Sequence, residues 1–485
     1  MGDDNGHTSN DGPTTKRRGF LAATGAAGVA SIAGCSSGGG GGETTTPPKD
    51  VEPASEINFI SESTPPSVAI KGIVDEFQKQ TGITVNMTLV PFNNYSEKIA
   101  SDLTSKSGNY QAFYVDPYVV GAKYYPYIQS LDPFINSDDW ADVPKGVNDF
   151  IDSHLDACGR YGDGRLRAFP YDCPTMMWVY RDDIINKYKE QAEKDLGFPF
   201  EPGPERTWQE YFEMAKWMNE NVDEVPYGTG HQAKQHDSLQ CDFHNVFWAH
   251  GAEDFTGYNG KPGDEVPKSD KITPTFAETG VGAAEFYKNL IDIAHPGSTT
   301  WTWSGVGQAF AQGKIAMCPE WHEFNAMFTN PDQSQVADKV SWSLLPQGDK
   351  RSANIYGGSG IGINKFASDA EKKAAWKFIT WATSPEIQLR ILKKTGGTPT
   401  RNSVYNMEEV KQAAQASSEE SQYPNVVPPV REAWKDSNVG LRPHIPQWPE
   451  LDKILYTEVS KMINDKKSPK AAMQSIDSSW KQTLQ

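Results

Sequence analysis

One carboxylate in this sequence stands where a binding group is expected. Asp116 directly follows the apolar run 112–115 and directly precedes Pro117. An ionised carboxylate at the end of a strand can accept two hydrogen bonds from hydroxyl groups. The same residue could instead form the turn that leads into Pro117. The chain also contains 14 Trp and 19 Tyr residues, whose flat rings serve both as core and as ligand-facing walls.

The body of the chain carries none of the common motifs of covalent or nucleotide-dependent catalysis. Its one G-x-S-x-G match, residues 34–38, falls within the lipobox and the Gly/Ser-rich segment described below, and it contains no HExxH and no P-loop, which disfavours a secreted hydrolase and a nucleotide-dependent enzyme. The adjacent acids Asp182 and Asp183 follow a strand-like run and are expected to begin a helix. We therefore predict a protein that is not an enzyme and that needs no cofactor.

A set of four histidines and a cysteine resembles a metal site more than any other part of the chain. Its members are His231, His236, Cys241, His244 and His250. Cys241 and His244 could share one face of a helix, but the spacing of the set matches no compact zinc pattern. We expect structural or polar roles for these residues and predict no metal site.

The N-terminal region has the ordered features of an exported, lipid-anchored protein. Arg17 and Arg18 precede an Ala/Gly-rich apolar stretch, 20–33, that suits a signal and is too short to span a membrane. This stretch is similar to a twin-arginine export signal. The segment 32–35 looks like a lipobox, with Cys35 as the residue that receives the lipid.

The segment that follows, 36–54, is rich in Gly, Ser, Thr and Pro and cannot bury enough apolar surface to fold. We expect residues 1–35 to form a twin-arginine lipoprotein signal and residues 36–54 to form a flexible linker. The protein would then be tethered to the extracellular face of the cytoplasmic membrane. A disordered tail with an accidental arginine pair is the alternative.

The four remaining cysteines would lie in an oxidising compartment, where disulfides form. Cys158 and Cys173 bracket the segment 162–164, Gly-Asp-Gly, a hairpin signal that would bring its flanks together. We predict a disulfide between Cys158 and Cys173. Four cysteines permit three connectivities, and four buried free thiols are the alternative.

Length and charge limit the function classes further. A chain of 485 residues is too long for one ordinary core and predicts two or three domains. Its formal net charge of −17 argues against a nucleic-acid partner, because phosphate binding demands a basic surface.

The elements that must position Asp116 alternate between strand and helix patterns. Residues 57–60 and 112–115 are short apolar runs, and residues 83–89 alternate with the period of a strand. Between the strands expected at 57–60 and 83–89, Ser67 is expected to cap one helix that ends at Gly82. Strands separated by helices indicate a parallel sheet, in which ligands lie beyond the carboxyl ends of the strands.

Further elements follow from the same patterns. Thr207 is a candidate N-cap for a helix over 208–219, and 310–317 indicates a helix end, a glycine stop and a strand. Residues 275–294, 449–464 and 469–482 are expected to be helical.

Five segments carry short motifs in a characteristic order. They are the segment 313–321 with the sequence GKIAMCPEW, the runs 169–171 and 180–182, the glycine-rich segment 357–364, the G-x-P-x-R loop 397–401 and the segment 445–448. In this order they resemble the extracellular solute-binding proteins of family 1, the maltose-binding-protein-like group. The resemblance spans roughly residues 56–482.

The resemblance implies a type II periplasmic-binding-protein-like α/β fold, with two parallel-sheet lobes joined by hinge strands and a ligand cleft between them. Lobe 1 would comprise residues 56–168 and 362–410, and lobe 2 residues 169–361 and 411–485. The implied function is that of a solute-binding protein that delivers a sugar or oligosaccharide to the transmembrane subunits of an ABC permease. We expect it to be a monomer.

The resemblance also implies a set of ligand-binding residues beside Asp116. A sugar ring has apolar faces that pack on an indole, and Trp321 occupies the position where the family carries a stacking aromatic. The other candidates are Trp448, which is expected to lie in the loop 445–448, and Tyr114, Glu320, Thr175, Gly358 and Trp303. For the aromatic residues the alternative is ordinary packing, and for Gly358 it is a plain turn. The alternative ligands are a polyamine, a metal or a phosphate ester.

Overall fold

The computed structural model describes residues 47–140, 142–258, 271–413, 426–435 and 437–485. The predicted signal, Cys35 and the first part of the predicted linker therefore lie outside the described residues. Residues 44–485 form one compact unit, and the account below concerns that unit alone. Among its described residues, no helix is both long and apolar enough to cross a membrane.

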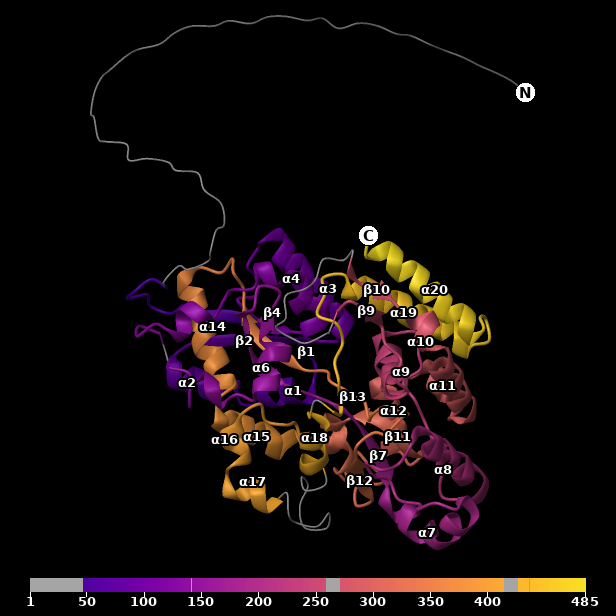
Figure 1. Ribbon diagram of the computed structural model, residues 1–485. Coiled ribbons are helices and arrows are strands. Elements are labelled where there is room, and N and C mark those ends of the chain that lie inside the picture. The colour runs from indigo at the N-terminus through magenta and orange to yellow at the C-terminus, as the bar shows by residue number, and fades with distance from the viewer. Residues whose placement is uncertain (1–46, 141, 259–270, 414–425, 436) are drawn as a thin grey trace, which may run out of the picture. The chain divides into compact units, whose positions relative to one another are not determined.

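The first sheet has five strands in the order β2-β1-β3-β14-β6, of which β1 and β2 are labelled in Figure 1. Their bounds are Thr84–Val90, Glu56–Glu62, Ala112–Val115, Ser359–Ile363 and Ala168–Asp172. Strands β2 and β3 run parallel to β1, whereas β14 is antiparallel to both of its neighbours. The sheet is therefore mixed, although parallel pairing was expected throughout.

Five helices accompany this sheet. They are α1 (Pro65–Lys71), α2 (Val74–Thr81), α3 (Phe92–Ser105), α14 (Asp369–Ala382) and α15 (Pro385–Thr395). The prediction of one helix capped by Ser67 is wrong. Thr64 is the N-cap of α1, and its side chain accepts a hydrogen bond from the Ser67 amide. Helix α1 ends at Lys71, with Gly72 as its C-cap, and the separate helix α2 begins at Val74. Ser67 is instead buried against Ser61, 2.8 Å between hydroxyl oxygens.

The second sheet has four strands in the order β12-β7-β11-β8. Their bounds are Val340–Ser343, Met176–Arg181, Ile315–Trp321 and Tyr227–Thr229. Here β7 is the strand that runs antiparallel to its neighbours. The antiparallel strand is in each sheet the one that the chain reaches after leaving the other sheet. Strand β7 of the second sheet follows β6 of the first, and β14 of the first sheet follows β12 of the second, after the short strand β13 (Asn354–Ile355).

Long helices accompany this sheet, and the sequence patterns located most of them. Thr207 caps α8 (Trp208–Asn221) through a capping box with Glu210, as predicted. The remaining long helices are α7 (Asp182–Leu196), α9 (Asp237–Ala249), α11 (Val281–Ile293), α12 (Trp303–Ala311), α19 (Trp448–Ile463) and α20 (Pro469–Thr483). Helices α19 and α20, at the yellow end of the chain in Figure 1, are packed on each other through Trp480, whose indole donates to the Leu451 carbonyl at 2.9 Å.

Shorter elements complete the unit. The short helices are α4 (Ala122–Tyr124), α5 (Asp132–Ile135), α6 (Asp152–Cys158), α10 (Phe276–Thr279), α13 (Asn325–Phe328), α16 (Asn402–Tyr405), α17 (Glu408–Ala413) and α18 (Val427–Ala433). The short strands are β4 (Arg160–Tyr161), β5 (Arg165–Leu166), β9 (Phe255–Thr256), β10 (Thr273–Pro274), β13 (Asn354–Ile355) and β15 (Val439–Gly440).

Two crossover segments connect the sheets and are hydrogen-bonded to each other. Residues 173–175 lead from β6 to β7, and residues 356–358 lead from β13 into β14. Thr175 and Tyr356 form an antiparallel bridge, and the Gly357 amide donates to the Pro174 carbonyl at 2.8 Å. The two connections therefore form one two-stranded link.

The predicted hairpin between Cys158 and Cys173 is present, but the predicted disulfide is not. Strands β4 and β5 pair antiparallel around Gly164, which adopts a positive φ of 74°. Cys158 and Cys173 are free, buried thiols, so the disulfide prediction is wrong for this structure and the alternative of buried thiols is correct. The Cys158 sulfur lies 3.3 Å from the Tyr356 hydroxyl, and burial raises the pKa of this thiol well above its usual range, which keeps it protonated.

Candidate functional site

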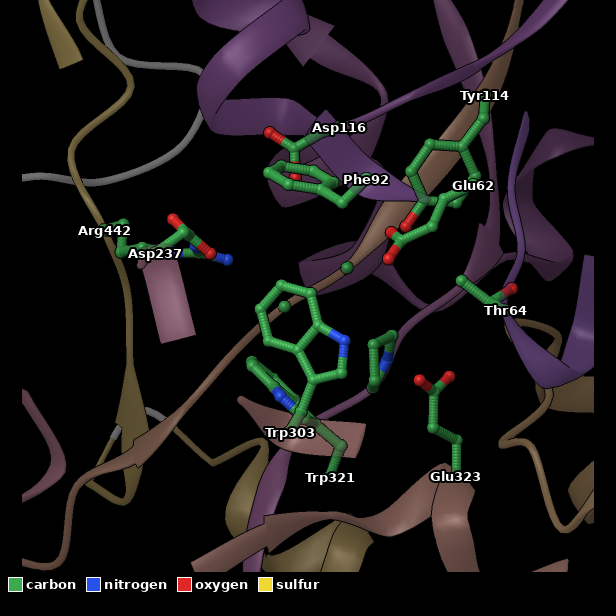
Figure 2. A pocket seen from close by; sticks show the side chains of 13 residues that line it. Glu62, Thr64, Phe92, Tyr114, Asp116, Asp237, Trp303, Trp321, Glu323 and Arg442 are labelled. Atoms are coloured by element: carbon green, nitrogen blue, oxygen red, sulfur yellow. The ribbon is translucent and has the colours of Figure 1, made fainter. Parts of the chain in front are cut away.

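A pocket lies where strands of both sheets end and where helices next to them begin (Figure 2). Its walls contain Glu62, Thr64, Phe92, Tyr114 and Asp116 from the region of the first sheet, and Asp237, Trp303, Trp321 and Glu323 from the region of the second. Pro174, Gly357 and Gly358 of the crossovers and Arg442 complete it. The cavity volume is about 60 Å³.

The position of the pocket follows from sheet geometry. Glu62 and Trp321 are the last residues of β1 and β11, and Asp116 follows the last residue of β3. Phe92, Asp237 and Trp303 are the first residues of α3, α9 and α12. Carboxyl ends of strands and amino ends of the following helices meet at the same edge of a sheet, so these side chains converge.

Asp116 forms the turn that its sequence position allowed and also lies in the wall of the pocket. One carboxylate oxygen accepts hydrogen bonds from the amides of Tyr118 and Val119, at 2.9 and 2.6 Å. The carboxylate thus caps the short helical turn 117–121 and also lines the pocket. Burial raises its pKa to about 6, although Arg442 and these amides favour the ionised form.

Four aromatic side chains form the apolar part of the wall. The rings of Phe92 and Trp303 meet edge to face with centroids 6.2 Å apart, and Tyr114 packs edge to face against Tyr95 at 5.3 Å. Trp321 is only 6% exposed and also belongs to the core of the second sheet. The pocket therefore offers flat apolar faces from both sides.

The crossover glycine Gly358 is required by backbone geometry as well as by space. Its φ is +66°, and a Cβ at this position would lie 2.3 Å from the Tyr356 ring and 2.5 Å from the Cys158 sulfur. A side chain there would be strained and would clash. Gly358 lines the pocket as predicted. The backbone conformation and the close packing of Tyr356 and Cys158 explain why this position is a glycine.

Carboxyl groups form the polar part of the wall, and burial perturbs them strongly. Figure 2 shows the carboxyl groups of Glu62 and Glu323 directed toward the same space. Burial raises the pKa of Glu62 to about 8, with Asp116 and Asp172 adding to the shift. Burial also raises the pKa of Asp172 to about 7 and that of Glu323 well above its usual range.

Arg442 is a cationic residue of the pocket wall and is engaged by its neighbours. One of its terminal nitrogens lies 3.8 Å from an Asp237 carboxylate oxygen. The guanidinium carbon lies 3.9 Å from the centroid of the Tyr118 ring. Its charge is therefore balanced inside the wall by a carboxylate and an aromatic face.

Three of the predicted site residues do not line this pocket. The buried Glu320 carboxylate accepts from Gln232 at 3.0 Å and from the Trp321 amide at 2.8 Å. Thr175 accepts from the indole of Trp434 at 2.9 Å. Trp448 was predicted to lie in a loop, which is wrong: it begins α19, is fully buried and belongs to the core of the second sheet, because its ring packs against Trp480.

Five predicted residues do converge on the pocket: Asp116, Trp321, Tyr114, Gly358 and Trp303. The residues that sequence reasoning missed include Glu62, Asp237, Glu323 and Arg442. Glu62 ends a strand as Asp116 does, and the same rule applied to the strand at 56–62 would have found it. Arg442 lies in an irregular segment and carries no signal in the sequence.

The histidine set has carboxylate partners within the fold. His231 lies 2.9 Å from Asp242 and His244 lies 2.8 Å from Asp254, each with a buried imidazole. Throughout the described ranges, no group of three or more His, Cys, Asp or Glu side chains is arranged to hold a metal ion.

The carboxyl groups of the pocket predict that the ligand-free protein gains stability as the pH falls from 8 to about 6.5. A carboxyl whose folded-state pKa is raised binds a proton in the folded state before it does so in the unfolded chain, so stability is lost as the pH rises. Each such group contributes up to about 1.4 kcal/mol for each pH unit, and Glu62 and Glu323 titrate this way. Below pH 6.5 the increase should slow, because burial lowers the pKa of His322 to about 4 and that of His444 to about 3.

Urea unfolding at pH 8.0 and 6.5 measures this difference. Glu62→Gln should be more stable than the natural protein at pH 8.0 and should show a weaker pH dependence between the two values. Equal stability of the natural protein at both values would contradict the assigned shifts.

Comparisons with solved structures show the fold. A solute-binding protein of Agrobacterium radiobacter K84 in complex with ribitol superposes with a TM-score of 0.74 at 22% identity, over 90% of this chain and 99% of that one. Maltose-bound MalE3 of T. maritima gives a TM-score of 0.71 at 21% identity, over 88% of this chain and 99% of that one. These likenesses confirm the predicted two-lobed α/β fold of the type II periplasmic-binding proteins.

Sequence relatives span most of the chain. A probable amino-acid ABC transporter periplasmic-binding protein of Sinorhizobium fredii is 26% identical over 415 residues, 83% of each chain. An erythritol/L-threitol-binding protein of Mycolicibacterium smegmatis is 24% identical over 421 residues, 80% of this chain and 82% of the relative. The profile of the bacterial extracellular solute-binding proteins matches residues 72–417, which is more than half of the sequence. The chain therefore belongs to the bacterial extracellular solute-binding protein family.

Proposed function

We propose that this solute-binding protein captures one small, hydroxyl-bearing solute, a polyol or a monosaccharide, and delivers it to an ABC permease. The observation that carries the proposal is the meeting of the Trp321 ring with the carboxyl groups of Asp116 and Glu62 in one pocket. An indole packs on the apolar faces of such a solute, and carboxyl groups accept hydrogen bonds from its hydroxyls. Membership in a family of binding proteins confirms that the chain is not an enzyme.

The ligands of similar proteins support a hydroxylated solute. A relative of this chain is named as a binding protein for erythritol and L-threitol, and similar solved structures are complexes with ribitol, D-mannitol and maltose.

The charge of the pocket argues against a phosphate ester. Two relatives are named as sn-glycerol-3-phosphate-binding proteins, at 22% and 20% identity. A phosphate group needs several convergent donors or cations. The wall of this pocket contains four carboxyl side chains and Arg442, which Asp237 already neutralises.

We also propose how the lobes are divided. Strand β6 of the first sheet ends at Asp172, and the chain returns to this sheet with β14 at Ser359. The division between the lobes would therefore fall within the crossovers 173–175 and 356–358. These positions lie a few residues from the boundaries expected from the sequence. Rotation about this two-stranded link would close the pocket over its solute.

A thermal-shift panel on the purified full chain tests the function. Erythritol, ribitol, mannitol, glucose and maltose are compared with glycerol 3-phosphate, each from 0.1 to 10 mM. At a hundredfold excess over Kd, a ligand that binds only the folded state adds about 2.7 kcal/mol of stability. Stabilisation by at least one polyol or monosaccharide supports the proposal, and stabilisation by glycerol 3-phosphate alone would replace it.

The anchor is proposed from the sequence and has its own test. We propose that Cys35 is lipidated after twin-arginine export and holds the protein at the extracellular face of the membrane. Cys35→Ala should release the protein into the medium, because a lipid chain contributes about 0.8 kcal/mol of membrane binding for each buried methylene. Fractionation of cells followed by immunoblotting measures the release. Membrane retention of this variant would mean that another segment is the anchor.

A further inference from the structure

The pocket has more carboxyl groups than cationic groups, and a neutral solute would not use their capacity to ionise. Four carboxyl side chains line it, from Glu62, Asp116, Asp237 and Glu323. They come from four separate elements: β1, the end of β3, α9 and the short helix at 322–324. Arg442 is a cation of the same wall, and it is paired with Asp237. Three carboxyl groups therefore face the cavity beside this pair.

Two of these carboxyl groups have an oxygen, Oε2 of Glu323 or Oδ1 of Asp237, that accepts from no N–H or hydroxyl donor of the described residues. Each lies against another buried carboxyl group instead, Asp172 beside Glu323 and Asp452 beside Asp237. Glu323 is 7% exposed, and its side chain points into the pocket (Figure 2). A buried carboxylate oxygen without a donor is costly, so a ligand that supplies a donor with positive charge would bind here with the largest gain.

The aromatic wall suits an organic cation. Phe92, Tyr114, Trp303 and Trp321 surround the same space, and the face of an aromatic ring attracts an ammonium group within about 6 Å. An inorganic cation is disfavoured, because no metal-holding group of acidic, His or Cys side chains occurs in the described ranges.

We propose that the solute carries a protonated amino group, which binds between Glu323 and Glu62 against the rings of Trp321 and Trp303. This inference rests on the proposed function and narrows its solute to a hydroxylated small molecule that also bears an amine, such as an amino sugar or an amino alcohol. The remaining hydroxyl or amino groups of the solute are held by Asp116 and Asp237.

Proton release provides a signature that a neutral solute would not give. The titratable and charged groups around the site are Glu62, Asp116, Asp172, Asp237, Glu323, Arg442 and Asp452. Burial raises the pKa of Glu62 to about 8 and that of Glu323 well above its usual range. An ammonium group favours the ionised forms, so its binding at pH 7 expels protons, and affinity rises between pH 6 and 8.

The experiment compares matched solutes that differ in amine and hydroxyl groups. The pairs are glucosamine and glucose, and serinol and glycerol, each tested by thermal shift on the purified full chain. The best amine is then titrated calorimetrically at pH 7 in two buffers of different ionisation enthalpy. At least one amine should bind tenfold or more tightly than its hydroxyl partner, with net release of protons.

Two variants identify the groups responsible. Glu323→Gln keeps the size of the side chain and removes its charge, and should weaken amine binding by tenfold or more and by a larger factor than it weakens binding of the hydroxyl partner. Glu97→Gln, at an exposed position of α3, is the matched control and should leave both affinities unchanged. Equal loss in both variants would overturn the inference.

The outcomes also separate this inference from the proposed function. Stabilisation by hydroxyl partners without preference for amines would overturn the inference and leave the proposed function intact. Tenfold amine preference with proton release would support both. Failure of every amine and every neutral solute to stabilise the protein would overturn both.

Discussion

Arg401→Ala is expected to lower the free energy of unfolding by about 3–5 kcal/mol, the range for breaking a buried, paired charge. The Arg401 side chain is fully buried. It donates to the carbonyls of Thr383, Pro144 and Gly146 at 2.8, 3.1 and 2.9 Å. Its guanidinium carbon lies 3.4 Å from the centroid of the Phe150 ring. Alanine would leave the carbonyls of Thr383, Pro144 and Gly146 without this donor, the first of them buried, and would open a cavity beside the ring.

Arg401→Lys is the matched control for charge. Lysine keeps the positive charge but cannot present a planar fork to carbonyls on two sides, so the loss should be smaller than for alanine yet clearly measurable. Urea denaturation of both variants provides the comparison. A loss below about 1 kcal/mol for Arg401→Ala would show that this residue does not hold the segments at 144–146 and 383 together.

Trp321→Ala is expected to reduce solute affinity by at least thirtyfold, about 2 kcal/mol, the size of effect seen at central aromatic contacts. Trp321 lines the pocket and also packs in the core of the second sheet. The variant should therefore lose stability too, toward the lower end of the 3–5 kcal/mol that a core tryptophan contributes. The solute identified by thermal shift serves for calorimetric titration, and urea denaturation gives the stability.

Trp448→Ala separates the two effects. Trp448 belongs to the same core but does not line the pocket, so its replacement should cost about 3–5 kcal/mol of stability and leave the affinity of the folded fraction unchanged. If Trp321→Ala and Trp448→Ala lower stability alike and neither changes affinity, Trp321 is a core residue only. The proposed packing of the solute on the Trp321 ring would then be wrong.

The sequence was informative about the fold wherever a pattern is local. The period of the run 83–89 located β2, Thr207 and Glu210 located the start of α8, and Gly313 located the break between α12 and β11. The direction of β14 was not predictable, because strand polarity is decided by the path of the chain through the other sheet. The break at Gly72 was missed because a continuous apolar face concealed it.

The site was predictable only where a polar or aromatic residue adjoins a clear strand. Asp116 and Trp321 follow that rule and line the pocket. Glu323 and Asp237 lie on short or separate helices, and Arg442 comes from an irregular segment, so only three-dimensional packing brings them together. The prediction for Trp448 was wrong because an isolated Trp next to proline looks like a loop residue, whereas here the proline begins a helix.

The place of β14 between β3 and β6 has a consequence for biosynthesis. The first sheet cannot be completed until residues 359–363 have left the ribosome. Asn364, just beyond β14, donates to Asp102, 262 residues earlier in the chain. At ribosomal rates of about 5–20 residues per second, β3 waits roughly 10–50 s for its partner. Contacts so distant in sequence slow folding, and an unpaired strand edge invites association with other chains. The nascent protein is therefore expected to depend on chaperones during this interval, and fragments that end before residue 359 should not form the first sheet.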